Sequence, residues 1–152
     1  MTGALDPSHA LARHIALARP TSLPAATVSA TCRDIQDTLG CMLGGSGAPG
    51  IDMLRSVVLH AGGRQDATVL LAGVRVPAQA AALVNGAMAH ALDFDDTHDK
   101  AGSIHPGAPV LAAALAMTEA RGGISGREFV TAVALGLDVA CRVALTARQD
   151  RG

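Results

Sequence analysis

The stretch that decides the fold is residues 77–121, PAQAAALVNGAMAHALDFDDTHDKAGSIHPGAPVLAAALAMTEAR. Two alanine-rich segments flank a polar middle, and alanine has the strongest intrinsic preference for helix. Because proline suits the first turn of a helix, we expect helices over about 77–92 and 106–121. The middle, residues 93–106, contains too many short polar residues and glycines for a helix, so we expect a loop there.

Apolar residues at helical spacing continue outward from this stretch in both directions. We expect further helices over about residues 5–18, 24–43, 51–60 and 125–146, with a glycine-rich loop at 44–50. Residues 67–71 and 74–76 are short β-like stretches that could make a small extended excursion, although they are too short to base a sheet on. The expected fold is therefore all-α, a bundle-like domain of about six helices with at most a short β-like excursion near 67–76.

Local polar patterns indicate helix ends and one ion pair. Asp6 or Ser8 can cap the first helix, and Ser125 with Glu128 fits the S-x-x-E capping box of the last one. Asp138 and Arg142 are four positions apart on that last helix, so we expect a structural ion pair between them.

Composition and charge exclude several classes of protein. Apolar residues make up 49% of the chain, but no apolar run reaches the roughly 18 residues of a membrane span, so we expect a buried helical core. With a net charge of −1, two Phe and no Trp or Tyr, the chain lacks a nucleic-acid footprint. Three widely spaced cysteines predict reduced thiols, packed as small core residues, in a cytoplasmic protein. The N-terminus is charged where a signal peptide would be apolar.

Titratable side chains are concentrated between His90 and His105. This segment holds four of the 13 acidic residues and three of the six histidines. Carboxylates close together raise one another's pKa, and histidines exchange protons near neutral pH, so the segment suits general acid–base catalysis. The free N–H groups of the helix that follows would face the loop and hold an anionic group of a substrate. Composition alone leaves a solvated surface loop equally open.

Two literal motif matches in this segment suggest a different chemistry. Asp95, Asp96 and Asp99 form a DDxxD pattern, which in helical prenyl synthases binds magnesium and diphosphate. His98-Asp99 forms the HD pair of helical metal phosphohydrolases. Both patterns are short, and neither a second aspartate-rich motif nor an aromatic-lined cavity accompanies them. A Mg²⁺-dependent helical enzyme is therefore an alternative function, which added Mg²⁺ would reveal by stabilising the protein.

Longer motifs resemble one family. The sequence NGAMAHALDFDDTH at 85–98, followed by HPGAPVL at 105–111, resembles the MmgE/PrpD family, which includes 2-methylcitrate dehydratase, cis-aconitate decarboxylase and iminodisuccinate epimerase. Two shorter stretches agree, DTLG at 37–40 and GLDVACR at 136–142. The resemblance extends from about residue 23 to 145. It implies an all-helical main domain and a metal-free, cofactor-independent enzyme acting on a small di- or tricarboxylate.

The resemblance also assigns roles to residues of this chain. Asp93 and His105 match active-site positions of the family, and Thr97 matches a position that contacts substrate. His98 is common in this branch and lies beside them, so we include it among the substrate-binding residues. The family's reactions are elimination of water, decarboxylation and epimerisation. All pass through a carbanion- or enolate-like species, with one group moving a proton at carbon and cations holding the carboxylates.

Three neighbours of these residues have supporting or open roles. His90 lies three residues before Asp93 and is expected on the same helix face, either as a second-shell partner of the site or as a satisfied core histidine. Asp96 is expected beside the site, and we favour backbone hydrogen bonding that shapes the loop for both Asp95 and Asp96.

Further residues of the family's active site come later in its pattern than the end of these 152 residues. They are a histidine after the sixth helix, then lysines and a tyrosine, and the family has an α/β lid domain beyond. The resemblance therefore implies that the chain is the N-terminal part of the helical domain, is inactive alone and exposes apolar surface. Family members usually pair as homodimers. A helical interaction module that does not need Asp93 and His105 is the non-enzymatic alternative.

Overall fold

The computed structural model describes residues 6–147. These form six α-helices, two 3₁₀ turns and one β-hairpin. The helices are α1 (Pro7–Leu17), α2 (Ala25–Gly45), α3 (Ile51–Ala61), α4 (Ala78–His90), α5 (Gly107–Arg121) and α6 (Gly126–Ala147). The turns are η1 (Pro20–Ser22) and η2 (Asp99–Ala101), and the strands are β1 (Ala67–Val69) and β2 (Val74–Val76). The all-α prediction with a short β-like excursion is confirmed.

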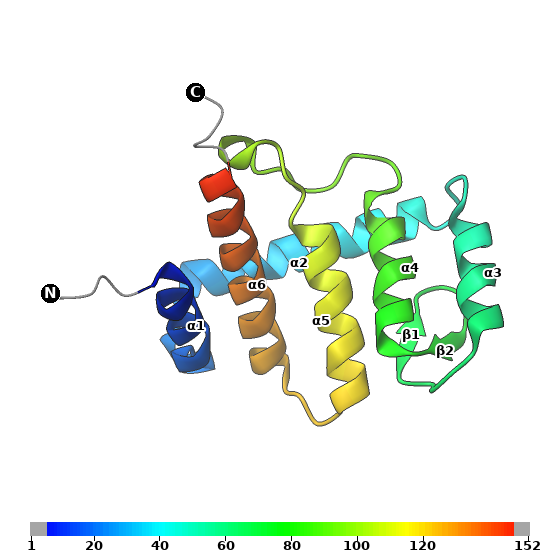
Figure 1. The fold of residues 1–152 in the computed structure, drawn as a ribbon, viewed down its shortest axis with the longest axis horizontal. Coiled ribbons are helices and arrows are strands. Elements are labelled where there is room, and N and C mark those ends of the chain that lie inside the picture. The colour runs from blue at the N-terminus through cyan, green and yellow to red at the C-terminus, as the bar shows by residue number, and fades with distance from the viewer. Residues whose placement is uncertain (1–5, 148–152) are drawn as a thin grey trace, which may run out of the picture.

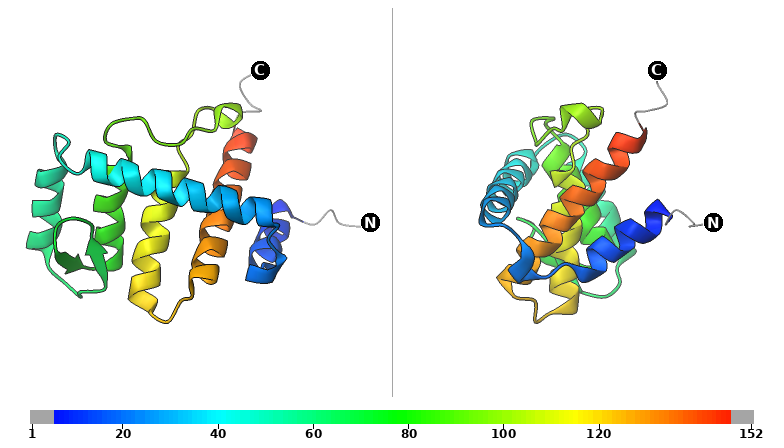
Figure 2. Two further views of the ribbon diagram at one scale, coloured as in Figure 1. Left: turned by 180° about the vertical axis from the view of Figure 1, so that it is seen from behind. Right: turned by 90° about the vertical axis from the view of Figure 1, so that its left-hand side faces the viewer.

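Helix α2 organises the molecule. Helices α4, α5 and α6 stand side by side, and α2 runs across all three (Figures 1 and 2). Helix α3 and the hairpin pack beside α4, whereas α1 lies at the opposite end next to α6 (Figure 1). The segment that joins α4 to α5 crosses the end of α5 and brings η2 against α6. This crossing segment contains the titratable residues.

Small residues let α4 approach two of its helical neighbours, α2 and α5, closely. Gly45 of α2 is buried against the backbone of Met88, where an added Cβ would overlap the carbonyl oxygen and lie 3.1 Å from the carbonyl carbon. On the other side, a Cβ at Gly86 would lie 3.5 Å from the Ala112 Cβ. The core around these contacts includes Met42 and Leu111, both fully buried. Alanine and glycine therefore set the helix spacing that positions the ends of the crossing segment.

A buried amide attaches the hairpin to α4. The Asn85 side chain donates to the Thr68 carbonyl oxygen at 3.0 Å and accepts from the Leu70 N–H at 3.0 Å. Glu119 of α5 accepts from the backbone N–H and the hydroxyl of Thr68, at 3.0 and 2.7 Å. Asn85 is 1% exposed, so its hydrogen bonds to the hairpin keep a buried polar group satisfied. Asn85, the first residue of the motif at 85–98, thus has a structural role.

Helix ends agree with the predicted boundaries to within a few residues. Asp6 caps α1 by accepting from the Ser8 N–H, and Ser125 and Glu128 form the expected capping box before α6. Helix α2 continues to Gly45, two residues into the expected loop, because Gly45 is packed against α4. Arg142 donates to Asp138 at 2.8 Å, which confirms the predicted ion pair, and His14 of α1 adds a second contact at 3.0 Å.

Two expectations about apolar residues need correction. Cys41 is buried, but Cys32 is exposed, so Cys32 is not a core residue. Residues Gly126–Thr146 of α6 are long and apolar enough to cross a membrane by length and composition, although no uninterrupted apolar run suggested it. Helix α6 packs against α2 and α5, but only 11% of its apolar window is buried. A single helix of this kind is weak evidence for a membrane span, since core helices pass the same test.

Exposed apolar surface was expected, and the structure shows it. Large hydrophobic side chains are exposed on several elements, among them Met53, Val57, Met117 and Phe94, which are 58% to 75% exposed.

Candidate functional site

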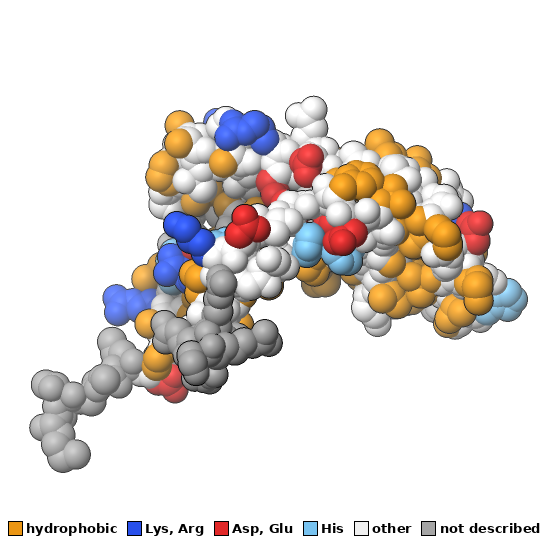
Figure 3. All heavy atoms as spheres, turned by 90° about the horizontal axis from the view of Figure 1, so that it is seen from above, with side chains coloured by type: hydrophobic (Ala, Val, Ile, Leu, Met, Phe, Trp, Pro, Cys, Tyr) orange, Lys and Arg blue, Asp and Glu red, His pale blue; other side chains and the backbone are white. Residues whose placement is uncertain are grey.

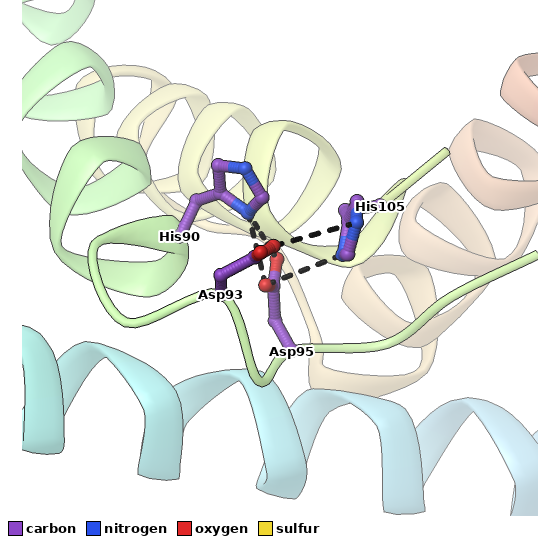
Figure 4. A group of neighbouring side chains, drawn as sticks. All are labelled: His90, Asp93, Asp95 and His105. Atoms are coloured by element: carbon purple, nitrogen blue, oxygen red, sulfur yellow. Dashed lines mark hydrogen bonds and ion pairs between the residues drawn. The ribbon is translucent and has the colours of Figure 1, made fainter. Parts of the chain in front are cut away.

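The loop between α4 and α5, residues 91–106, has little regular structure but a defined backbone. It leaves α4 through Asp93, which has a positive φ of 55° and donates its N–H to the His90 carbonyl oxygen at 3.2 Å. Farther along, the His98 N–H donates to the Ile104 carbonyl oxygen at 2.9 Å, and this contact encloses the 3₁₀ turn η2. These contacts fold the loop back on itself, so its two ends meet above α2 (Figure 4).

Four side chains converge where the ends of this loop meet. His90 comes from the last residue of α4, Asp93 and Asp95 from the first part of the loop, and His105 from just before α5 (Figure 4). One potential ligand atom from each of the four lies within 4.8 Å of the others. We call this group the His–Asp cluster. It unites Asp93 with His105, the two residues that the sequence predicts to be catalytic.

Asp95 is the buried member of the His–Asp cluster. Its side chain is 0% exposed, and its carboxylate shares a hydrogen bond with His90 Nδ1 at 2.9 and 3.2 Å. This hydrogen bond raises the pKa of His90, because it favours the charged imidazolium. The two imidazole rings of the cluster lie 4.7 Å apart and are tilted by 57°.

His105 lies between the buried carboxylate and an exposed one. Its Nδ1 is 3.4 Å from Asp95 Oδ1, and its Nε2 is 3.7 Å from Asp93 Oδ1. The Asp93 side chain is 78% exposed, whereas that of His105 is 24% exposed. On the face seen from above, acidic and histidine side chains lie together beside a broad area of hydrophobic ones (Figure 3). The Nε2 side of His105, next to Asp93, is therefore the side that a ligand can reach.

Asp96 has a structural role at the start of α5. Its Oδ1 accepts from the Gly107 N–H at 2.8 Å, so the loop's own carboxylate occupies the end of this helix. The expectation that this helix end would hold a substrate anion is therefore not supported at Gly107. A Cβ at Gly107 would collide with the Asp96 carboxylate and lie 2.7 Å from Thr38 Oγ1. Burial raises the pKa of Asp96, partly opposed by the hydrogen bond from Gly107.

The predicted substrate-binding residues lie outside the His–Asp cluster. Thr97 is exposed in the loop, and His98 caps η2, where its Nδ1 accepts from the Ala101 N–H at 3.3 Å. Both stay predictions as substrate contacts. His90 differs from the prediction, because α4 ends at His90 and Asp93 is not on a shared helix face. His90 contacts Asp95 instead, and its exposed side chain excludes the core-histidine alternative.

The ligand types in the His–Asp cluster, two imidazoles and two carboxylates, could hold a divalent metal ion. The expectation of metal-independent chemistry therefore rests on the family resemblance. Of the three DDxxD carboxylates only Asp95 belongs to this cluster, and Asp96 instead accepts from the Gly107 N–H. In residues 6–147 the only group of three or more potential ligands is the His–Asp cluster, which omits Asp96 and Asp99.

Sequence reasoning missed the central position of Asp95 and a second acidic residue nearby. Asp34 of α2 has a buried Oδ2 for which no partner is found within the described part of the chain. Burial, together with the charges of Asp96 and Asp37, raises the pKa of Asp34 to about 6. Asp95 was expected to bond the backbone of the loop, but its carboxylate contacts the side chains of His90 and His105 instead. No local pattern marks Asp34, because its environment includes Asp96, which is distant in sequence.

Comparison with known proteins identifies one family. Residues 9–151 match the model of the MmgE/PrpD N-terminal domain. A search among curated proteins found no match.

Proposed function

Since the chain belongs to the MmgE/PrpD family, whose members are generally dehydratase-like lyases, we propose that its His–Asp cluster serves a cofactor-independent lyase that acts on a small di- or tricarboxylate. The reaction we favour is elimination of water from a substrate such as 2-methylcitrate. Asp93 and His105 are the proposed acid–base pair. Thr97 and His98 are the proposed substrate contacts, with His90 and Asp96 supporting the site.

The observation that carries this proposal is the 3.7 Å distance between Asp93 Oδ1 and His105 Nε2, from opposite ends of the loop. A substrate placed at this edge has a proton acceptor and a second proton-carrying group in reach. His105 Nε2 removes a proton from the carbon next to a carboxylate, and the electron pair forms the carbon–carbon double bond. The carbon–oxygen bond breaks, and the acid–base pair Asp93 and His105 delivers one proton to the hydroxyl group, which leaves as water.

The His–Asp cluster is made of two histidines and two aspartates, and the family resemblance places its active-site lysines later in the pattern. A substrate with two or three carboxylates next to Asp93 and Asp95 needs cationic partners to offset the repulsion between like charges. We therefore propose that these 152 residues supply the proton-transfer half of a site and give no turnover by themselves.

The experiment compares the 152-residue chain with the polypeptide that its source expresses. Each is incubated with 2-methylcitrate, cis-aconitate and iminodisuccinate, with and without EDTA. We expect the source polypeptide to dehydrate 2-methylcitrate, with EDTA having no effect. Asp93→Asn and His105→Gln should each reduce kcat at least about 100-fold, the usual scale for loss of an acid–base group. His60→Gln, an exposed histidine at the end of α3, is the matched control and should retain full activity.

Turnover of cis-aconitate or iminodisuccinate alone would keep the acid–base site but replace elimination as the reaction. Full activity in Asp93→Asn and His105→Gln, or loss of activity in EDTA, would overturn the proposal. Turnover by the 152-residue chain would show that the described cluster is sufficient.

A further inference from the structure

We propose that Asp95 is the positioning residue of this site. Its buried carboxylate holds His105 in the tautomer that carries hydrogen on Nδ1, which leaves Nε2 free for proton transfer on the side of Asp93. This inference rests on the proposed function only for the identity of the reaction. The tautomer itself is a property of the protein without substrate.

Burial and distance support this role for Asp95. The carboxylate is removed from solvent, so its charge requires donors within the protein. His90 Nδ1 is one donor, at 2.9 Å. His105 Nδ1 is buried with no hydrogen-bond partner found among residues 6–147, and Asp95 Oδ1 is an acceptor only 3.4 Å away. A small rotation of the His105 ring makes this second hydrogen bond and satisfies both buried groups.

The buried and the exposed carboxylate lie on opposite sides of the His105 ring. Asp95, with no exposed side-chain surface, lies behind the His105 ring, and Asp93, which is 78% exposed, lies in front of it. A carboxylate behind an imidazole fixes its tautomer and orientation and stabilises the imidazolium that forms when the opposite nitrogen accepts a proton. Asp93 cannot have this role, because it faces Nε2, the nitrogen on the accessible side.

His90 completes the arrangement, because it shares the same carboxylate. Two imidazoles 4.7 Å apart face one buried Asp95, and the nearby Asp96 adds a second negative charge. Carboxylate oxygens accept several hydrogen bonds, so Asp95 can serve both rings at once. In an asparagine of the same shape only one oxygen accepts, and it lacks the negative charge that strengthens the hydrogen bonds from both rings. Asp95→Asn is therefore a nearly isosteric substitution that removes one of the two acceptors.

Nitrogen-detected NMR of the histidine rings tests this on the substrate-free 152-residue chain, with His105→Gln used to assign the signals. We expect the neutral His105 ring in the wild type to carry its proton on Nδ1. In Asp95→Asn this tautomer should be lost to the Nε2–H form or to a mixture. In His90→Gln the Nδ1–H tautomer of His105 should persist, because His105 is then the only imidazole next to the Asp95 carboxylate. Asp52→Asn, at an exposed carboxylate of α3, is the matched control and should leave the spectrum unchanged.

A His105 ring protonated on Nε2 in the wild type would overturn the proposal, and this measurement does not require Asp95→Asn to fold. A folded Asp95→Asn variant with an unchanged tautomer would overturn it equally. In the active polypeptide, Asp95→Asn should reduce kcat about 100-fold or more while changing KM less than about threefold, as expected for a residue that acts through the base. The expected tautomer without turnover of any tested acid would uphold the positioning role and contradict the proposed function.

Discussion

Helices α4 and α5 and the loop that joins them are held in place by different interactions. The helices meet through small apolar residues, with Gly86 of α4 against Ala112 of α5 and Gly45 of α2 against α4. The loop is held by polar contacts, namely Asp96 with Gly107 and Asp95 with His90. Packing thus sets the spacing of the scaffold, and hydrogen bonds to one buried and one half-buried carboxylate set the geometry of the site. Four substitutions test this division, from the largest expected effect on stability to the smallest.

Gly45→Ala should have the largest effect on stability. The new methyl group would overlap the Met88 carbonyl oxygen, so α2 and α4 must separate. We expect the free energy of unfolding to fall by about 3 kcal/mol, at the upper end of typical overpacking costs. Gly40→Ala on the same helix is the matched control, because nothing lies within 4 Å of its Cβ position. It should stabilise the protein by about 0.5–1 kcal/mol through helix propensity. Urea denaturation measures the change in the free energy of unfolding of both variants. Equal changes would contradict the conclusion that the contact of Gly45 with Met88 sets the spacing of α2 and α4.

Asp96→Ala tests the junction between loop and scaffold. Loss of the cap on the Gly107 N–H should lower the free energy of unfolding by about 1–2 kcal/mol. Asp96→Asn keeps an oxygen acceptor and removes a charge whose pKa is already raised by burial, so it should recover most of that loss at neutral pH. Denaturation at pH 7 compares the two. A loss in Asp96→Asn as large as that in Asp96→Ala would show that the charge and not the cap matters.

Asp34→Asn tests whether the negative charge of the Asp34 carboxylate in α2 lowers the stability of the scaffold. The folded-state pKa of about 6 lies above the unfolded value, so folding favours the protonated carboxyl. This contribution is present below about pH 4 and is lost as the pH rises through about 6. Asparagine stays neutral, so Asp34→Asn should be more stable than the wild type by on the order of 1 kcal/mol at pH 7.5, after allowance for partial exposure, and by almost nothing at pH 4.

Thermal unfolding of the wild type and Asp34→Asn at several pH values measures this difference. Asp52→Asn, on the exposed side of α3, should show no such trend. A stability difference between Asp34→Asn and the wild type that does not change with pH would contradict the raised pKa.

Thr97→Ala should have the smallest effect on stability. Thr97 is exposed in the loop, so the free energy of unfolding should change by less than about 0.5 kcal/mol. If Thr97 contacts substrate as the family pattern implies, KM of the active polypeptide should rise several-fold. Stability loss above about 1 kcal/mol would show that exposed loop residues also hold the scaffold, and an unchanged KM would remove Thr97 from the site.

Much of the scaffold was predictable because its signals are local. The positions of the six helices were predicted from helical periodicity and from the prolines and glycines at their ends. The capping box of Ser125 and Glu128 formed as expected. The extension of α2 to Gly45 was not predictable, since that last turn is held by contact with Met88 on another helix. The exposure of Cys32 has the same origin, because it depends on which face of α2 the other helices cover.

The sequence by itself determined the helical fold, the place of the polar loop and the family, because these follow from periodicity and from an unbroken motif. Only the tertiary structure decided the roles within that motif. It separated Asp95, buried between two histidines, from Asp93, which is exposed, and from Asp96, which caps α5. The physical reason is that Asp93 turns the backbone through a positive φ and the loop closes over α2, so adjacent, chemically identical side chains enter different environments.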